Sequence, residues 1–445
     1  MSLYNHLHHL VFRLKDLRDG SGIYSRLARL KKEQYLPPQR LASLQNERLR
    51  SLLTQAQSHS RYYRQRFIAG NVEIDVHFDL SQLPQLPLLR REDLQDNLED
   101  ILCDNARSPW LNSSGGSTGH PVNFYHDETY RVNGEAGQLL FLNWMGVRPG
   151  DRTAVFWGAD REFKDLSRYD RLMMRINRVK QLNSFAMSDQ LIEQFLEEIN
   201  RYRPRYVYGY ASSLYLVARF INRTTPLAFQ PVAVRSSAEM LFDFQRREIE
   251  KAFKAPVFNF YGSREVNNIA AECSAHRGLH VFASGRIVEV VDDDGVPVPD
   301  GELGQVAVTD LVNHAFPFIR YLTGDMAVVS SAVCACGRGY PLLQKIEGRC
   351  SDMIVIDGQY IHGEFFTHLF YGRPEITRFQ FIQETKDHLR LRVVSRDDRP
   401  QMEEVLTAIR TKAGRQVTIS VEVVESIPTA PSGKHRFTIS KLKES

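Results

Sequence analysis

From residue 153 to residue 261 the sequence alternates between short apolar stretches, typical of buried strands, and longer amphipathic stretches, typical of helices. The expected strands are Thr153–Trp157, Tyr206–Tyr208, Val232–Val234 and Val257–Tyr261, and the expected helices are Ser188–Arg203, Ser212–Ile221 and Phe242–Phe253. Such alternation builds βαβ units and therefore a largely parallel sheet. We predict an α/β fold whose ligands bind at the carboxyl ends of the strands.

The chain is too long for one hydrophobic core. It has 445 residues, whereas one core serves about 250–300 residues. The pattern becomes β-rich between residues 287 and 329, and a further set of strands and a helix follows Gly348 and Arg349. We expect a large N-terminal domain (1–348) with parallel-rich sheets and a β-rich subdomain, a hinge (349–352), and a small mobile α+β domain (353–445).

Composition excludes several classes of protein. The formal net charge of +4 is small for this length, which argues against a dedicated nucleic-acid binder. No apolar run approaches the length of a transmembrane span, so no transmembrane segment is expected. Five cysteines without paired spacing favour a reducing cytoplasm over a disulfide framework.

The first residues predict an amphipathic helix. Leu3, Leu7, Leu10, Leu14 and Leu17 recur at helical spacing between polar residues. The segment is too polar for a signal peptide. We expect this helix to dock on the body of the protein, with a membrane surface as the alternative.

A loop rich in glycine and hydroxyl side chains spans residues 113–119. Glycines allow a backbone to approach an anion closely, and N–H and O–H groups can donate to phosphate oxygens. The alternative is a flexible linker. A phosphate loop is favoured because the run is short, ends at Pro121 and precedes a strand-like stretch. No lysine follows the last glycine, so this is not a Walker A loop.

Three further segments carry candidate binding residues. Tyr261-Gly-Ser-Arg-Glu265 follows an expected strand, where an aromatic ring can stack on a flat ligand and a carboxylate can bind a hard cation. Ser236-Ser-Ala-Glu239 follows another strand, although its glutamate could equally start a helix. Asp325 ends Tyr321-Leu-Thr-Gly-Asp, where it could accept hydrogen bonds from ribose hydroxyls or simply cap a turn.

Near the end of the chain, Lys434 lies in Pro431-Ser-Gly-Lys-His-Arg436. A lysine held by a glycine-containing turn can supply positive charge to a developing phosphate charge. By itself such a lysine is most often solvated surface.

These segments, taken in order, resemble the motifs of adenylate-forming enzymes, the superfamily of acyl-CoA synthetases, adenylation domains and luciferases. Within it, the chain is most similar to the phenylacetate–CoA ligase group and its relatives from capsular polysaccharide loci. The segment His59-Ser-Arg-Tyr-Tyr63 matches that group as well. The resemblance covers nearly the whole chain.

The resemblance implies residue roles. Tyr261 would pack against adenine, Glu265 would bind Mg²⁺, Asp325 and Arg349 would reach the ribose, and Lys434 would bridge the substrate carboxylate and the α-phosphate. The candidate catalytic residues are Lys434, Glu265 and Thr118. The candidate ATP- and AMP-binding residues are Ser113, Ser114, Gly115, Gly116, Ser117, Thr118, Gly119, Ser237, Ala238, Glu239, Tyr261, Gly262, Ser263, Asp325 and Arg349.

The implied reaction is attack of a carboxylate on the α-phosphorus of ATP, which releases pyrophosphate and leaves an acyl-adenylate. Transfer to the thiol of CoA would follow, and transfer to an amine is the alternative acceptor. A nucleotide-binding relative without turnover is a further alternative. Implied cofactors and partners are ATP, Mg²⁺, CoA, a small carboxylic acid and a homodimer partner, in the cytoplasm.

Cys273, His280, Cys334 and Cys336 form a possible zinc site. Three thiolates and one imidazole are a structural zinc complement. Cys334-Ala-Cys336-Gly favours a turn around a metal, and some relatives in the resembled group carry such a set here. His276 is the rival fourth ligand.

Two features leave the identity of the acid and the acyl-transfer step undetermined. The family's hinge aspartate would stand at position 351, where this chain has Ser351, followed by Asp352. The expected acid pocket, between residues 144 and 210, is rich in aromatic residues, which suits an aryl acid but also an ordinary core. Those residues are Trp157, Phe163, Tyr169, Tyr208 and Tyr210.

Overall fold

In the computed structural model the chain divides by its internal contacts into two compact units. The larger comprises Met1–Thr323 and Ala327–Ile346, and the smaller comprises Gly324–Met326 and Glu347–Ser445. The predicted hinge at 349–352 stays a prediction. The structure describes residues 3–114, 122–157, 167–182, 189–224, 226–349, 354–356, 359–361, 366, 369–370, 373, 375–397, 400–413, 417–428 and 436–442.

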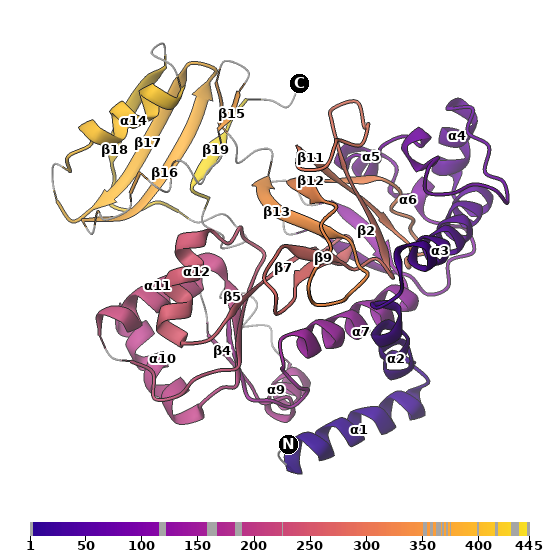
Figure 1. Ribbon diagram of the computed structural model, residues 1–445, viewed down its shortest axis with the longest axis horizontal. Helices are drawn as coiled ribbons and strands as arrows, with labels where there is room; N and C mark the ends of the chain where they lie inside the picture. The colour runs from indigo at the N-terminus through magenta and orange to yellow at the C-terminus, as the bar shows by residue number, and fades with distance from the viewer. Residues whose placement is uncertain are drawn as a thin grey trace. The chain divides into compact units, whose positions relative to one another are not determined.

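An eleven-stranded sheet has the order β10-β11-β12-β13-β9-β8-β7-β6-β5-β3-β4 (Figure 1). Its parallel part runs through β4 (Val179–Leu182), β3 (Thr153–Phe156), β5 (Tyr206–Tyr210), β6 (Ala233–Ser237) and β7 (Val257–Ser263). Strands β3 and β5 are short and mostly apolar, as expected for strands covered on both faces, whereas β4 and β6 also carry Lys180 and Arg235. The predicted α/β fold class is confirmed.

Three helices pack on the parallel strands. They are α10 (Asp189–Tyr202), α11 (Ala211–Arg223) and α12 (Asp243–Phe253). Their apolar side chains, such as Ile199, Leu214 and Ile249, form one buried cluster with strand residues Val207 and Val234. The alternation read from the sequence therefore corresponds to the βαβ units that it predicted. Helix α9 (Arg168–Ile176) and strand β4 were not foreseen.

The antiparallel part of the sheet begins at β7. It continues through β8 (Asn267–Glu272), β9 (Leu279–Val281) and β13 (Leu342–Arg349), and β10 (Arg286–Val291) pairs antiparallel with β11 (Leu303–Asp310). Strand β12 (Tyr321–Ser330) lies between β11 and β13. A separate hairpin pairs β1 (Trp110–Ser113) with β2 (Asn123–His126).

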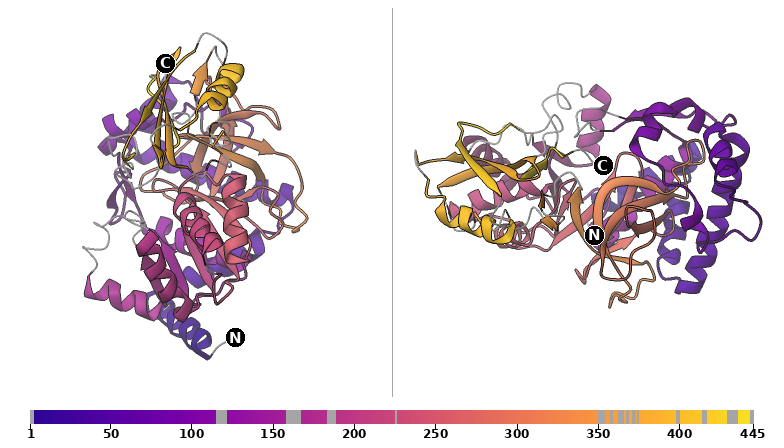
Figure 2. Two further views of the ribbon diagram at one scale, coloured as in Figure 1. Left: turned by 90° about the vertical axis from the view of Figure 1, so that its left-hand side faces the viewer. Right: turned by 90° about the horizontal axis from the view of Figure 1, so that it is seen from above.

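Helices of the N-terminal part share the largest apolar core with this antiparallel region, and Figure 2 shows them gathered along one side of the large unit. They are α2 (Ile23–Glu33), α3 (Pro38–His59), α4 (Arg61–Ala69), α5 (Arg91–Asp96), α6 (Leu98–Ile101) and α7 (Glu128–Trp144). A short 3-10 helix, η1 (Leu83–Gln85), also contributes. No helix in the described residues is long and apolar enough to cross a membrane.

The smaller unit has its own sheet and core. The sheet order is β18 (Thr418–Val423), β17 (His388–Ser395), β16 (Ile376–Thr385) and β19 (Thr438–Ser440), and a hairpin joins β14 (Ile354–Ile356) to β15 (Gln359–Ile361). Helix α14 (Glu403–Ala413) supplies Val405 and Ile409 to the buried cluster. This unit is the α+β body that the sequence predicted.

Candidate nucleotide site and cysteine–histidine cluster

Two of the nucleotide-binding candidates lie side by side at the carboxyl ends of neighbouring parallel strands. Ser237 ends β6 and pairs in register with Phe260 of β7, directly before Tyr261. Ligands of open α/β sheets bind at this edge. The segments Ser236–Glu239 and Tyr261–Glu265, which are far apart in the sequence, are therefore neighbours in the fold.

Tyr261 and Gly262 occupy an irregular end of β7. The Tyr261 ring is buried, and its hydroxyl shares a hydrogen bond of 3.1 Å with Thr323 Oγ1 on β12. The register with β8 shifts between Tyr261 and Gly262. A Cβ at Gly262 would stand 2.4 Å from the carbonyl oxygen of Asn267, so a side chain would force the strands apart. Asp325 follows Thr323 by two residues and belongs to the smaller unit.

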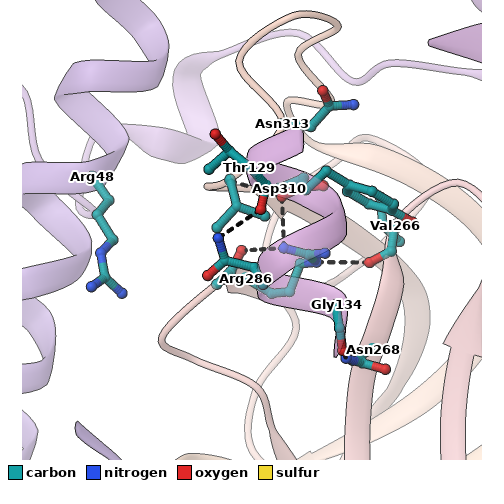
Figure 3. A network of polar contacts seen from close by, with 12 residues as sticks. Arg48, Thr129, Gly134, Val266, Asn268, Arg286, Asp310 and Asn313 are labelled. Atoms are coloured by element: carbon teal, nitrogen blue, oxygen red, sulfur yellow. Dashed lines mark hydrogen bonds and ion pairs between the residues drawn. The ribbon is translucent and has the colours of Figure 1, made fainter. Parts of the chain in front are cut away.

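Three consecutive carbonyl groups after Gly262 accept hydrogen bonds from buried side chains. The hydroxyl of Tyr130 donates to the carbonyl of Arg264 at 3.3 Å, and His126 Nε2 donates to the carbonyl of Glu265 at 2.9 Å. Arg286 Nε donates to the carbonyl of Val266 at 2.8 Å (Figure 3). We call Tyr130, His126 and Arg286 the carbonyl clamp. It fixes the backbone from which the Glu265 carboxylate projects.

A buried ion pair anchors the clamp. Arg286 Nη1 lies 2.6 Å from Asp310 Oδ1, and both side chains are withdrawn from solvent. Figure 3 shows Arg286 beside α7, with contacts to both Asp310 and Val266. Asp310 also accepts from the N–H of Val312 at 2.9 Å. A buried charge is tolerated where a partner and hydrogen bonds satisfy it, as they do for this guanidinium.

The other two members of the clamp stack on each other. The rings of His126 and Tyr130 lie 3.6 Å apart at 12°. Tyr130 is placed by the start of α7, where the Asp127 side chain accepts from the Tyr130 N–H at 2.7 Å. Burial lowers the pKa of His126 to about 4, so the ring is neutral near pH 7. We infer that the proton is on Nε2, because that atom faces a carbonyl oxygen.

The glycine and serine loop is described only at its two ends. Ser114 Oγ accepts from the N–H of Val122 at 2.9 Å and from Arg91 at 3.2 Å, and the Ser114 N–H donates to the Val122 carbonyl at 2.9 Å. These bonds draw the loop ends together. Arg264 Nη1 donates to the carbonyl of Ser113 at 3.4 Å. Residues outside the described part are Gly115, Gly116, Ser117, Thr118, Gly119, Ser351, Asp352 and Lys434.

A pocket of about 430 Å³ opens beside the clamp. One wall is aromatic, from Trp110, His126 and Tyr130, and another carries the amides of Gln138 and Asn267. Ser263 and Arg264 of the Tyr-Gly-Ser-Arg-Glu segment complete the lining, so this cavity adjoins the candidate nucleotide site.

The aromatic residues that suggested an acid pocket do not all share one place. The rings of Trp157 and Tyr210 stack at 4.2 Å, with Tyr208 at 6.1 Å from Trp157. Tyr169 is instead 61% exposed on α9. Phe163 lies outside the described residues.

Glu239 has a local structural partner. Its Oε2 accepts from the N–H of Ser212 at 2.8 Å, at the start of α11. A carboxylate is favoured in this position, because the N-terminus of a helix carries partial positive charge. Ala238 beside it has φ of 66°, a left-handed conformation that a non-glycine residue rarely adopts. Such strain is found most often at functional sites.

Four predicted zinc ligands meet in the large unit. The ligand atoms of Cys273, His280, Cys334 and Cys336 all lie within 4.8 Å of one another. The two sulfur atoms of Cys273 and Cys334 are 3.6 Å apart, and Cys336 Sγ is 3.2 Å from His280 Nε2. Tetrahedral zinc with sulfur at about 2.3 Å places two sulfurs about 3.8 Å apart.

The histidine of this cluster is oriented for metal binding. His280 Nδ1 donates to the Tyr340 carbonyl at 3.0 Å, which leaves Nε2 to face Cys336. A second hydrogen bond of this kind is usual for a zinc-bound histidine. Burial raises the pKa of Cys273 to about 12, so that thiol is neutral unless a cation is bound.

The rival ligand His276 is outside the cluster. Its Nδ1 lies 3.1 Å from Glu272 Oε2, and its ring packs against Phe258 at 4.7 Å. The structure therefore brings His280, rather than His276, to the three cysteines. Cys103 is a buried thiol elsewhere in the core.

Known proteins are similar to this chain along most of its length. The family described as the CapK C-terminal domain matches residues 353–441. Protein CapK of Staphylococcus aureus is 24% identical over 421 residues, covering 91% of this chain and 90% of the relative. Phenylacetate-coenzyme A ligase of Thermus thermophilus is 26% identical over 430 residues, covering 90% of this chain and 94% of the relative.

Over about 90% of its length the chain is therefore similar to the phenylacetate–CoA ligase-like group of the adenylate-forming superfamily. The predicted resemblance is confirmed, and with it, at the level of the family, the prediction of an AMP-forming acid ligase.

Solved structures of the adenylate-forming superfamily share the fold. A 2-hydroxyisobutyryl-CoA ligase in its postadenylation state aligns with a TM-score of 0.72 at 20% identity, covering 92% of each chain. The amide bond synthetase McbA of Marinactinospora thermotolerans aligns with a TM-score of 0.50 at 18% identity, covering 71% of this chain and 65% of the other.

The sequence motifs do not include the members of the carbonyl clamp. His126 and Tyr130 follow the glycine and serine loop, and Arg286 begins a β-strand. None of them stands in a segment whose spacing indicates chemistry. An arginine at the start of an apolar stretch, Arg286-Ile-Val, was the one available signal.

Proposed function

We propose that this adenylate-forming ligase activates a small carboxylic acid with ATP, releases pyrophosphate and transfers the acyl group to the thiol of CoA. The observation that carries the proposal is the clamped segment 264–266, which holds Glu265 at the carboxyl end of β7 beside the end of β6. A rigid, charged group at this edge of a sheet suits the binding of a nucleotide.

The residues of the chain would divide the work as follows. Tyr261 packs against the adenine ring, Asp325 and Arg349 bind the ribose, and Ser113–Gly119 hold the phosphates. Glu265 holds Mg²⁺, which neutralises phosphate charge when it is bound. A carboxylate oxygen of the acid attacks the α-phosphorus, the bond to the β-phosphate oxygen breaks, and Lys434 stabilises the charge that develops.

An amine is the alternative to CoA as the acceptor of the acyl group. Curated relatives named phenylacetate-coenzyme A ligase favour a thiol acceptor, whereas an amide bond synthetase shares the fold. An amine acceptor would turn the same acyl-adenylate into an amide. The hinge, where Ser351 replaces the expected aspartate, acts after adenylation and so bears on this second step alone.

We also propose one structural zinc ion at Cys273, His280, Cys334 and Cys336. The donor set, the spacing of the sulfurs and the oriented imidazole support it. The four ligands leave no open position for water, so the ion would brace the fold and take no part in the reaction.

Pyrophosphate release across a panel of aryl and aliphatic acids, with CoA, with amines and without an acceptor, tests the function. We expect release with at least one acid, and an acyl-CoA product when CoA is present. Glu265→Gln should abolish release, whereas Glu302→Gln, an exposed turn residue, should not. Binding of ATP without release for any acid would favour the non-catalytic alternative.

A further inference from the structure

Helix α1 (Leu3–Asp19) packs on the rest of the large unit through polar and aromatic side chains. Tyr4 Oη donates to the carbonyl of Ile176 at 2.5 Å, and the guanidinium of Arg178 lies 3.4 Å from the Tyr4 ring centroid. Asn5 Nδ2 donates to Asp151 Oδ1 at 2.6 Å. This arrangement differs from the expected one, in which an amphipathic helix buries its apolar face.

The rest of the docking face is also polar. His8 Nε2 lies 3.0 Å from Asn177 Oδ1, and the His8 ring packs so closely on Gly150 that a Cβ there would stand 2.9 Å away. Asp16 accepts from the N–H groups of Ile23 at 2.8 Å and Tyr24 at 3.0 Å. Along its length, α1 is therefore held by specific hydrogen bonds.

The opposite face of α1 is apolar and exposed. Leu7, Leu10, Val11, Leu14 and Leu17 are between 51% and 71% exposed. At 100° per residue they form one continuous stripe, which we call the leucine stripe. A single exposed leucine is unremarkable, but a contiguous apolar patch marks an interaction surface.

Positive charge borders the leucine stripe. Arg13 and Lys15 are exposed and project just beyond its two edges by the helical repeat, whereas Arg18 falls within the stripe. Asp16 is turned inward, and Asp19 pairs with Arg18 at 2.8 Å, so the positive charge at the edges comes from Arg13 and Lys15.

The neighbouring helix repeats the pattern. The last residue of α9 is Ile176, whose carbonyl accepts from Tyr4, so the two helices adjoin. Tyr169, Leu172 and Ile176 of α9 are exposed, and Arg168, Arg171 and Arg175 occupy a separate stripe of the same helix. None of the residues of α9 is buried.

We propose that the leucine stripe is a membrane-docking surface that binds reversibly to bilayers containing anionic lipid. An apolar helical face bordered by arginine and lysine matches the boundary between acyl chains and negatively charged head groups. A second copy of this chain fits less well. Across a two-fold axis each stripe would meet its own copy, and the bordering cations would meet like charge.

One helix of this size binds a membrane weakly. Its binding therefore depends both on burial of the leucine stripe among acyl chains and on attraction of its positive charge to anionic lipid. Removing two leucines should reduce partition into vesicles by roughly tenfold or more, since each buried CH₂ contributes to it. Replacing Arg13 and Lys15 should remove the preference for anionic lipid. Raising the salt from about 0.1 M to about 0.5 M should weaken binding of the native chain.

Co-sedimentation of the full chain with vesicles tests the proposal. The vesicles are phosphatidylcholine alone, or phosphatidylcholine mixed with phosphatidylglycerol. The variants are Leu10→Ser with Leu14→Ser, and Arg13→Gln with Lys15→Gln, which we call the charge variant. The matched control is Val296→Ser with Val333→Ser, which removes two exposed apolar side chains elsewhere in the large unit. Circular dichroism and pyrophosphate release in vesicle-free solution report whether each variant keeps its fold.

We expect the native chain and the valine control to sediment with anionic vesicles, and both stripe variants to remain in the supernatant with unchanged pyrophosphate release. Failure of the native chain to bind anionic vesicles overturns the proposal. So does equal binding by the leucine variant and the native chain. A dimer, seen by light scattering, that the leucine variant converts to a monomer would assign the stripe to a second copy instead. If the leucine variant fails to fold, the charge variant decides between these outcomes.

Discussion

Arg286 and Asp310 form a buried ion pair of 2.6 Å, and the same guanidinium holds the carbonyl of Val266, the residue after Glu265. The interior of the large unit is thereby linked to the proposed metal-binding carboxylate. Removing one member of such a pair leaves a buried charge without its partner, which is far more costly than removing both.

We predict that Asp310→Ala lowers the free energy of unfolding by about 3–5 kcal/mol, because Arg286 then remains charged and buried. The double variant Arg286→Met with Asp310→Leu should be destabilised less than Asp310→Ala. Equilibrium denaturation in urea measures both. If Asp310→Ala and the native chain have the same urea midpoint of unfolding, the ion pair does not contribute this stability.

His126 should make stability depend on pH. Burial lowers its pKa in the folded chain to about 4, whereas the unfolded value is near 6.5. The unfolded chain therefore binds more protons between these pH values, and stability falls as the pH falls. His126 should contribute a loss of up to about 3 kcal/mol between pH 6.5 and pH 4.

The variant His126→Gln isolates this contribution, because its amide can still donate to the carbonyl of Glu265 and does not titrate. The difference in unfolding free energy between the native chain and the variant, measured across this pH range, should change with pH. A constant difference would mean that the ring does not titrate as its burial requires.

Lys434→Ala should lower kcat for pyrophosphate release by roughly 10²-fold or more, because its charge acts mainly in the transition state. Lys441→Ala is the matched control, since Lys441 pairs with Glu384 at 2.6 Å in the same unit. Equal activity of the two variants would remove Lys434 from the mechanism. A preformed acyl-adenylate should still be transferred by Lys434→Ala.

Asp325→Ala should raise the KM for ATP by about tenfold or more and change kcat little. Charge-assisted hydrogen bonds to ribose are present before and during the reaction, and each contributes about 1.5–3 kcal/mol. Asp294→Ala, in an exposed turn, should leave both constants as they are. Calorimetric ATP affinity that is the same in both variants would reduce Asp325 to a turn residue.

Protein purified without added metal should contain about one zinc per chain, and a strong chelator should lower its Tm before activity is affected. Cys336→Ser should lose the metal, whereas Cys103→Ser, a buried thiol outside the cluster, should keep it. Zinc far below one equivalent, with Cys273, Cys334 and Cys336 reactive toward thiol reagents, would contradict the site.

Local pattern was sufficient for most strands and helices between residues 153 and 261, although it missed α9 and β4, because the periods of 2 and 3.6 residues are properties of neighbouring side chains. The motif Tyr261-Gly-Ser-Arg-Glu265 was equally local, and so was the donor chemistry of the three cysteines. Sequence alone left His276 and His280 as rivals, because both follow Cys273 closely. Only the pairing of β9 with β13 brings His280 to Cys336.

The carbonyl clamp could be recognised only from the tertiary structure. Its hydrogen bonds join residues that are 139, 134 and 20 positions apart, and no local period relates such positions. The orientation of α1 was decided in the same way. The sequence determined that this helix has an apolar face, but the hydrogen bonds of Tyr4, Asn5 and His8 to distant residues turn that face outward. Amphipathicity is a property of one helix, whereas the face that is buried depends on the partners that the rest of the chain presents.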